Sequence, residues 1–163
     1  MVVWIIGKSG SGKTFISKKI FNSLRQKNKI LIDGDQIRTI FYKNKLGFNK
    51  NDRKKNAQFI TRLCKFLEKN DLIVICAIQS IFPEMQKENR KQFKKYLQIY
   101  MKVNNDVLIK RNNKNIYKKK NVVGLDIKFP EPVKSDLVIH NNFKNDLLRE
   151  KKIIIKMITK KIH

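Results

Sequence analysis

The residues with the most specific spacing are the glycines, lysine and threonine near the start of the chain. The segment Gly7-Lys8-Ser9-Gly10-Ser11-Gly12-Lys13-Thr14 matches the pattern G-x-x-x-x-G-K-[ST] in full. An apolar run precedes it and a helical pattern follows it, which is the context the pattern requires. In such a loop, backbone N–H groups converge on phosphate oxygens at a helix N-terminus. The sequence therefore predicts binding of ATP or GTP.

Two side chains of this loop have predicted chemical roles. We expect Lys13 to act on the β- and γ-phosphates, and the Thr14 hydroxyl to ligate Mg²⁺. The other expected nucleotide-binding residues of the loop are Gly7, Ser9, Gly10, Ser11 and Gly12. A GTPase would need a base-recognition motif of the N-K-x-D type, which Asn105-Asp106 does not supply. The pattern favours a small-molecule kinase that uses ATP and Mg²⁺.

Asp33-Gly34-Asp35 follows the second expected strand, residues 30–32. Ligands of an open α/β sheet collect at the carboxyl ends of its strands, so both carboxylates should lie near the phosphate-binding loop. There they can orient or deprotonate an acceptor hydroxyl, and Asp35 can join Thr14 at the metal. The alternative is that an Asp only caps the next helix. We expect Asp33 or Asp35, or both, to be catalytic.

Arginine is sparse in this chain, with seven among 38 basic residues. A guanidinium grips phosphate or sulfate oxygens with two parallel hydrogen bonds, which lysine cannot do. Arg62, Arg90 and Arg149 lie on helix faces that we expect to be solvated. Arg38, Arg53 and Arg111 do not lie on such solvated faces, and we expect them to contact an anionic ligand.

The elements that must position these residues alternate between strand and helix. Strands are expected at residues 2–6, 30–32, 72–78, 97–103 and 136–139, and helices at 13–27, 49–70, 83–95, from 106 to 112, and 143–162. This alternation predicts an α/β fold with a parallel sheet, helices on both faces and strand 72–78 at the centre. Residues 113–135 break the pattern, and we interpret them as a lid within a single domain of residues 1–163.

The composition limits the classes of partner. A net charge of +25 can steer polyanions towards the protein, or it can reflect a general bias to lysine along the whole chain. Nucleic-acid binding predicts basic residues interleaved with aromatics, and only Tyr117 with Lys118–Lys120 offers that. A membrane role for the basic C-terminal helix is the other alternative. We expect neither partner, and a cytoplasmic protein with reduced Cys64 and Cys76.

Taken in order, these segments resemble the adenylylsulfate kinase family over residues 2–139. The matching pieces are Gly7–Thr14, Asp33-Gly34-Asp35 with Arg38, Leu46-Gly47-Phe48 with Asp52-Arg53 and Asn56, residues 72–77, and Ile116-Tyr117. The resemblance implies a P-loop kinase that uses ATP and Mg²⁺ to phosphorylate the 3′-hydroxyl of a nucleotide 5′-derivative. It also implies a homodimer.

Residue roles follow from the same resemblance. Catalysis would fall to Asp33 and Asp35, and contacts between the lid and the nucleotide to Arg111 and Lys114. The residues implied in acceptor binding are Asp35, Arg38, Phe48, Arg53, Asn56, Gln79, Ser80 and Asp126.

The chain departs from the family pattern on the acceptor side. The family's Ile-Ser-Pro-Tyr followed by arginine becomes Gln79-Ser80-Ile81-Phe82-Pro83, and its paired arginines become Gln58-Phe59. The lid segment Lys-Asn-Phe-Thr before Gly-Ile-Asp is shortened to Asn121-Val122-Val123 before Gly124-Leu125-Asp126. The family's lid phenylalanine stacks on the acceptor base, an interaction of about 1–3 kcal/mol. Phe129 is the available substitute.

These departures point to a changed acceptor. One branch of the family, cytidine diphosphoramidate kinase, performs the same 3′-phosphorylation on a pyrimidine nucleotide for capsule modification. The parent activity makes 3′-phosphoadenylylsulfate for sulfate assimilation. Both acceptors stay open, and we favour the cytidine one, with base choice depending on the lid and Gln79. A polynucleotide kinase or other basic nucleic-acid binder is the alternative from another class.

Overall fold

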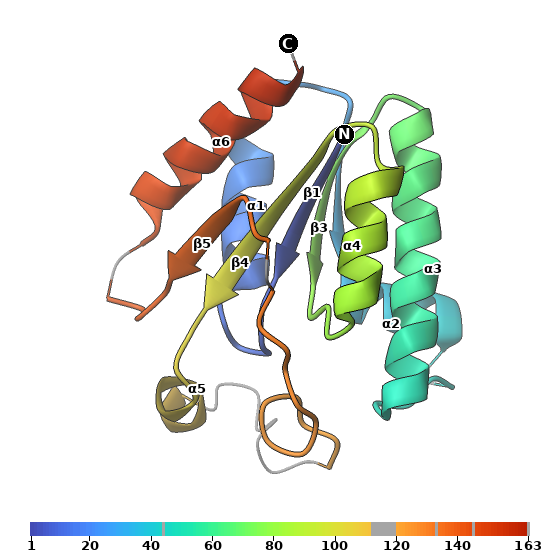
Figure 1. Cartoon of the computed structure of the whole chain (residues 1–163). Helices are drawn as coiled ribbons and strands as arrows, with labels where there is room; N and C mark the ends of the chain where they lie inside the picture. Colours follow the sequence, from blue (N-terminus) through green and yellow to red (C-terminus); the bar gives the residue numbers. More distant parts are fainter. Residues whose placement is uncertain (44, 112–119, 133, 145, 163) are drawn as a thin grey trace.

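The computed structural model describes residues 1–43, 45–111, 120–132, 134–144 and 146–162. Its centre is a five-stranded parallel sheet in the order β2-β3-β1-β4-β5 (Figure 1). The strands are β1 Val2–Ile6, β2 Lys29–Asp33, β3 Ile73–Ile78, β4 Tyr96–Lys102 and β5 Leu137–His140. The helices are α1 Lys13–Ser23, α2 Gly34–Tyr42, α3 Lys50–Lys69, α4 Pro83–Gln92, α5 Asn105–Arg111 and α6 Leu148–Ile162. The predicted fold class is confirmed.

The middle strand is β1, so the prediction that β3 is central was wrong. Both strands are buried along their whole length, and β3 lies between β2 and β1. An apolar run indicates burial on both faces of the sheet, which every interior strand shares. Because β1 is in the middle, the loop that follows it reaches strands on either side.

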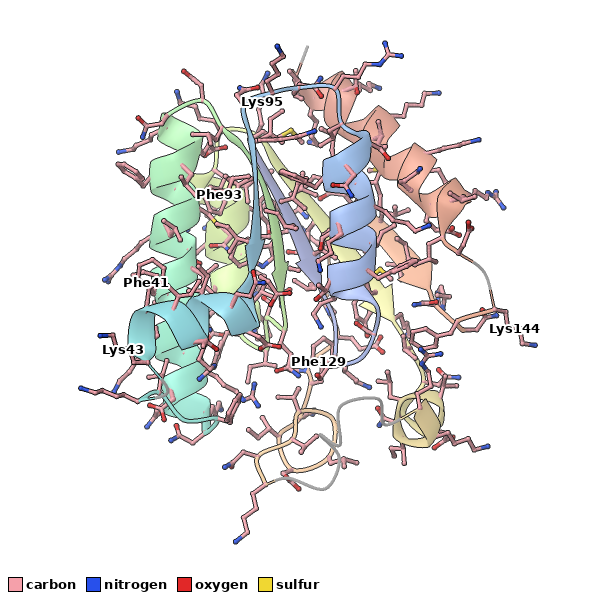
Figure 2. All side chains as sticks on the ribbon, turned by 180° about the vertical axis from the view of Figure 1, so that it is seen from behind. Phe41, Lys43, Phe93, Lys95, Phe129 and Lys144 are labelled. Atoms are coloured by element: carbon pink, nitrogen blue, oxygen red, sulfur yellow. The ribbon has the colours of Figure 1, made fainter. Side chains whose placement is uncertain are left out.

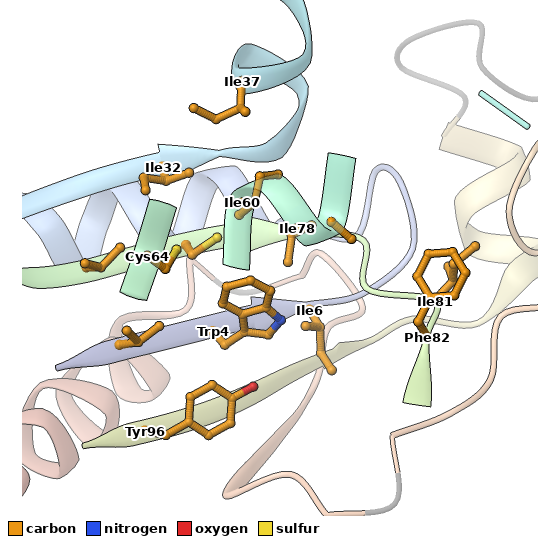
Figure 3. Close-up of a cluster of buried hydrophobic side chains, with 14 of the residues drawn as sticks. Trp4, Ile6, Ile32, Ile37, Ile60, Cys64, Ile78, Ile81, Phe82 and Tyr96 are labelled. Carbon is orange, nitrogen blue, oxygen red and sulfur yellow. The ribbon is translucent and has the colours of Figure 1, made fainter. Parts of the chain in front are cut away.

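Alternate side chains of β1 point into two separate cores. Val2, Trp4 and Ile6 face α3 and α4, where Trp4 packs near Ile60 and Cys64 (Figure 3). Val3 and Ile5 face the opposite side and join buried residues of α1 and α6: Ile16, Ile20, Ile154 and Ile158. Figure 1 shows α1 and α6 on one side of the sheet and α3 and α4 on the other. The result is a three-layer sandwich. Within the described ranges, no helix has the length and apolarity needed to cross a bilayer.

Several helices are shorter than the sequence pattern predicts. Helix α6 begins at Leu148 rather than at residue 143, because Phe143 and Leu147 have left-handed φ values of 63° and 61°. Helix α3 begins one residue after Asn49, whose side chain accepts a hydrogen bond from the Asp52 N–H and caps the helix.

The segment predicted as a lid divides into two parts. Residues 113–119 and 133 lie outside the described residues, so the prediction for Lys114 does too. Residues 120–132 pack against the end of the sheet. Val122 and Val123 are buried, and so is Phe129, which Figure 2 labels. Phe129 stacks on Tyr100 with ring centroids 5.9 Å apart. This part of the segment contributes to the core.

Arg90, which was expected on a solvated helix face, lies partly exposed on α4 and also makes specific contacts. Its guanidinium donates two hydrogen bonds to Asp136, at 3.1 and 3.0 Å, and one to the Lys134 carbonyl at 2.6 Å. Asp136 also accepts a hydrogen bond from the Gln98 N–H at 2.7 Å. These bonds join α4 to the entrance of β5. Burial alone would raise the pKa of Asp136, but the hydrogen bonds from Arg90 and Gln98 outweigh it and lower the pKa.

Replacing Asp136 by Asn should destabilise the fold by about 1 kcal/mol, because solvent partly screens the lost charge pair. A change of that size should lower Tm by about 2–4 °C at neutral pH. Since the folded pKa of Asp136 is lowered, its stabilisation is present above about pH 4 and disappears as the pH falls further. The difference in Tm between the wild type and Asp136→Asn should therefore vanish in acid.

The matched control is Glu131→Gln, which removes the ion pair between Lys102 and the exposed Glu131. We expect little change in Tm for this variant. An equal loss of Tm in both variants would contradict the assigned role of the bond between Arg90 and Asp136.

Candidate active site

A cavity of about 440 Å³ opens at the carboxyl ends of β1, β2 and β3. It extends from the phosphate-binding loop at one end to the beginning of α3 at the other. Among the residues predicted to act, those that line it are Ser9, Gly10, Gly12, Lys13, Thr14, Asp33, Asp35, Arg38, Arg53, Asn56, Gln79, Ser80 and Arg111. Residues predicted from five separate segments thus share one cavity.

Hydrogen bonds from the side chains of Lys13 and the buried Asn141 fix the backbone of the phosphate-binding loop. Gly12 precedes α1 with φ 95°, and a Cβ there would lie 2.8 Å from Asn141 Nδ2. This close approach allows Asn141 Nδ2 to donate to the Ser11 carbonyl at 3.1 Å. Lys13 Nζ donates to the Lys8 carbonyl at 2.7 Å. The Ser11 hydroxyl is buried and has no partner in the described structure. These groups leave the loop's centre available for phosphate oxygens.

Asp33 links this loop to the next strand and helix. The Thr14 hydroxyl donates to Asp33 Oδ2 at 2.8 Å, and the Asp35 N–H donates to Asp33 Oδ1 at 2.9 Å. Asp33 is therefore the N-cap of α2, as one alternative held, and it also contacts the loop. Hydroxyl and carboxylate oxygens are ligands that suit Mg²⁺. The metal pair was predicted as Thr14 with Asp35, whereas the structure pairs Thr14 with Asp33.

Asp35 is placed differently from Asp33. It lies in the first turn of α2, it is exposed, and it lines the cavity. Within the described part of the chain, its carboxylate accepts no hydrogen bond. It can therefore accept one from a ligand hydroxyl without breaking a contact that the fold needs.

Two arginines lie together at the far end of the cavity. The guanidiniums of Arg38 and Arg53 lie 4.8 and 5.5 Å from the centre of the Phe48 ring. Arg38 donates to the carbonyls of Leu46 and Gly47, which fixes the loop that carries Phe48. Phe48 itself is half exposed and stands outside the cavity lining.

The electrostatics of this pair favour an anion. Burial lowers the pKa of both arginines, and the charge of Arg38 lowers the pKa of Arg53 further. Among the described residues, neither arginine forms an ion pair, and the buried Nε of Arg38 has no partner. The charge of Asp35 raises the pKa of both arginines and that of Asp52 raises the pKa of Arg38, but burial outweighs them. A bound phosphate or sulfate would stabilise two cations that lack a direct ion-pair partner.

Asn56 and Ser80 line the cavity, and both form hydrogen bonds with other parts of the fold. Asn56 is 5% exposed, and its Nδ2 donates to the Gly34 carbonyl at 3.3 Å while its Oδ1 is buried without a partner in the described structure. Ser80 has a left-handed φ of 49°, and its hydroxyl accepts a long 3.5 Å hydrogen bond from Trp4. Asn56 thus keeps a free acceptor for a ligand, whereas the Ser80 hydroxyl already has a partner in the fold.

At the phosphate-binding end of the cavity, Arg111 was predicted, whereas Asn141, Phe143 and Leu147 were missed by sequence reasoning. The guanidinium of Arg111 stacks on the Phe143 ring at 3.8 Å, and Asn141, Phe143 and Leu147 line the cavity beside it. An aromatic and a guanidinium are suitable partners for a nucleotide base. The available signal was position, because Asn141 and Phe143 directly follow β5, where ligands of such sheets collect.

Besides Phe48 and Ser11, three more residues with predicted contacts lie outside the cavity lining. Asp126 is exposed, and its carboxylate accepts the Val122 N–H at 2.9 Å to close its own loop. Phe129 is buried against Tyr100 and is not positioned to stack on a base. Gly7 lies behind the loop, where a Cβ would come 2.7 Å from the Met101 carbonyl.

Together, the fold and this cavity define a P-loop phosphotransferase. One end presents backbone N–H groups, Lys13 and Thr14 to a polyphosphate, and the other presents two guanidiniums to a second anion. Two carboxylates lie between the ends. This order suits transfer of a phosphoryl group between two bound anions.

The comparisons with known proteins agree. The family model of adenylylsulphate kinase matches residues 1–140. The chain therefore belongs to the adenylylsulfate kinase family, and it is an ATP-using kinase. The family predicted from the sequence is confirmed.

Two relatives differ in their acceptors. The cytidine diphosphoramidate kinase of Campylobacter jejuni is 36% identical over 165 residues, covering 96% of this chain and 95% of the relative. A probable adenylyl-sulfate kinase of Archaeoglobus fulgidus is 30% identical over 153 residues, covering 89% and 97%. The Mycobacterium tuberculosis APS kinase in complex with AMPPNP and APS superposes with a TM-score of 0.86 at 20% identity, covering 97% of this chain and 96% of the other. That likeness shows the fold.

The two carboxylates should respond differently to removal of their charge. Asp35→Asn should lower kcat by about 10²–10⁴ if Asp35 orients or accepts the acceptor proton. Its Tm and its KM for ATP should change little, because Asp35 is exposed and is not bonded by the fold.

Asp33→Ala should instead lower both kcat and stability, the latter by about 1 kcal/mol, because Asp33 caps α2 and accepts from Thr14. Steady-state kinetics and thermal melting of both variants separate the roles. Unchanged kcat in Asp35→Asn would rule out its assigned role.

Proposed function

We propose that this protein transfers the γ-phosphoryl group of ATP to the 3′-hydroxyl of cytidine 5′-diphosphoramidate. The observation that carries this choice is the 36% identity to a cytidine diphosphoramidate kinase along nearly the whole of both chains. The cavity supports it, because a pair of guanidiniums is available for the 5′ group.

The residues divide the chemistry between them. Lys13 and the loop N–H groups hold the β- and γ-phosphates, and Arg111 with Phe143 holds the base of ATP. Thr14 and Asp33 would hold Mg²⁺, which neutralises charge on the β- and γ-phosphates when it is bound. Asp35 would accept the proton of the acceptor 3′-hydroxyl as its oxygen bonds to the γ-phosphorus and ADP leaves.

The acceptor would lie across the remaining wall of the cavity. Arg38 and Arg53 supply charge for the 5′ diphosphate group, which relieves their mutual repulsion. Asn56 Oδ1 is the buried acceptor available to a sugar hydroxyl or a base amino group. Phe129 does not line the cavity, whereas Phe82 does and Phe48 lies beside Arg38 and Arg53 at its edge. These two aromatics would lie near the acceptor base.

Adenosine 5′-phosphosulfate is the second candidate acceptor. It is favoured by the family model and by the 30% identical relative from Archaeoglobus fulgidus. The same loop, carboxylates and arginines would serve it. We also propose a homodimer of the 19.4 kDa chain and a cytoplasmic location, where ATP is supplied.

Competitive turnover tests the proposal. Cytidine 5′-diphosphoramidate and adenosine 5′-phosphosulfate are supplied together with ATP and Mg²⁺, and both 3′-phosphorylated products are measured. We expect kcat/KM to favour the cytidine acceptor. A preference of about tenfold for adenosine phosphosulfate, which is about 1.4 kcal/mol of transition-state discrimination, would contradict it.

A further inference from the structure

Gln79 stands directly beside Arg53 at the exit of β3, and it lines the cavity. Arg53 Nη1 donates a hydrogen bond to Gln79 Oε1 at 2.6 Å. A guanidinium has only donors, so the oxygen of the Gln79 amide must face Arg53. The orientation of this amide is therefore fixed by its partner, and Nε2 points away from the guanidinium.

Arg53 is itself held on three sides. Its Nε donates to the Phe48 carbonyl at 2.7 Å, and its Nη2 donates to the Asn121 carbonyl at 3.0 Å. The guanidinium therefore has a defined place between the beginning of α3 and residue 121. Because Arg53 cannot easily turn, Gln79 Oε1 is fixed as well.

The fixed amide has unused hydrogen-bonding capacity. A carbonyl oxygen accepts two hydrogen bonds, and Arg53 supplies one to Oε1. Within the described residues, Gln79 Nε2 donates no hydrogen bond, although the side chain is half-buried. Gln79 thus offers one acceptor and one amino donor side by side at the cavity wall.

The acceptor Oε1 and the donor Nε2 of Gln79 together match a terminal phosphoramidate of the acceptor nucleotide. A phosphoramidate carries an amino group that donates and phosphoryl oxygens that accept. A carboxamide can therefore pair with it through two hydrogen bonds, N–H to Oε1 and Nε2–H to phosphoryl oxygen. A sulfate or a phosphate presents only acceptors when ionised, so Oε1 would face an oxygen and repel it.

We propose that Gln79 selects the terminal phosphoramidate of the acceptor, while Arg53 beside it supplies the charge that any anionic terminal group needs. This inference rests on the proposed function, since it concerns the same acceptor site. It changes the role predicted for Gln79, which was expected to choose the base. Its bond to Arg53 assigns it instead to the 5′ terminal group.

The test compares two acceptors that differ only at that group, cytidine 5′-diphosphoramidate and cytidine 5′-diphosphate. The wild type should prefer the diphosphoramidate. Gln79→Met keeps the length of the side chain and removes both hydrogen-bonding atoms. It should lower kcat/KM for the diphosphoramidate by about tenfold or more and change the value for cytidine diphosphate by less than about threefold.

A role limited to holding Arg53 would give a different result. Both acceptors need the arginine, so both kcat/KM values would then fall by the same factor, and the proposal would be wrong. Gln79→Glu gives a second test, because it keeps an acceptor for Arg53 but replaces the amino donor by a charge. It should also lose the preference for the diphosphoramidate. Retained preference in both variants would equally overturn the proposal.

Gln58→Met is the matched control, because Gln58 is exposed on α3 and lies outside the cavity lining. This variant should keep the wild-type preference. Results with the wild type distinguish failure of the proposed function from failure of the role proposed for Gln79. If it phosphorylates adenosine phosphosulfate and neither cytidine acceptor, the proposed function fails. If it prefers the diphosphoramidate and Gln79→Met does too, only the role of Gln79 fails.

Discussion

The carboxylate of Asp33 is the contact on which the arrangement of this site depends. One oxygen accepts from Thr14 in the phosphate-binding loop, and the other caps α2 through the Asp35 N–H. The loop that receives ATP and the helix that carries Asp35 and Arg38 are therefore fixed to the same side chain. A shift of the loop would move the acceptor groups with it, and in-line transfer tolerates little misplacement.

The second constraint is the charge at the far end of the cavity. Arg38 and Arg53 are close enough for one to lower the pKa of the other, and no carboxylate within the described ranges pairs with them. The fold holds them with carbonyl oxygens and the Phe48 ring, which orient the guanidiniums. Asp35 and Asp52 act on this charge without forming an ion pair, so they offset only part of it. When an anion binds, it relieves the repulsion between the two guanidiniums. This relief contributes to the binding free energy of the acceptor.

The phosphate-binding loop and the alternation of strands and helices could be predicted from the sequence because both are local patterns. The family followed from the resemblance of the ordered segments, which also implied the roles of Arg38 and Arg53. The position of Asp33 and Asp35 near the loop followed from their place at the end of a strand. Contacts across the chain could not be predicted. Arg90 bonds to Asp136, and Asn141 bonds to Ser11, at separations of 46 and 130 residues. Phe129 shows the same limit, since nothing local distinguishes an aromatic that stacks on a base from one that packs on Tyr100.

The central claim is that a phosphoryl group is delivered to a ribose hydroxyl between the two anion-binding ends of the cavity. The position of the new phosphate tests it most directly. After turnover of cytidine 5′-diphosphoramidate with ATP and Mg²⁺, phosphorus NMR of the product should show a new phosphomonoester whose phosphorus couples to the ribose H3′ proton. The 3′-deoxy acceptor should yield no such product. A new phosphate on the terminal group or on the 2′-oxygen, or turnover of the 3′-deoxy acceptor, would contradict the account.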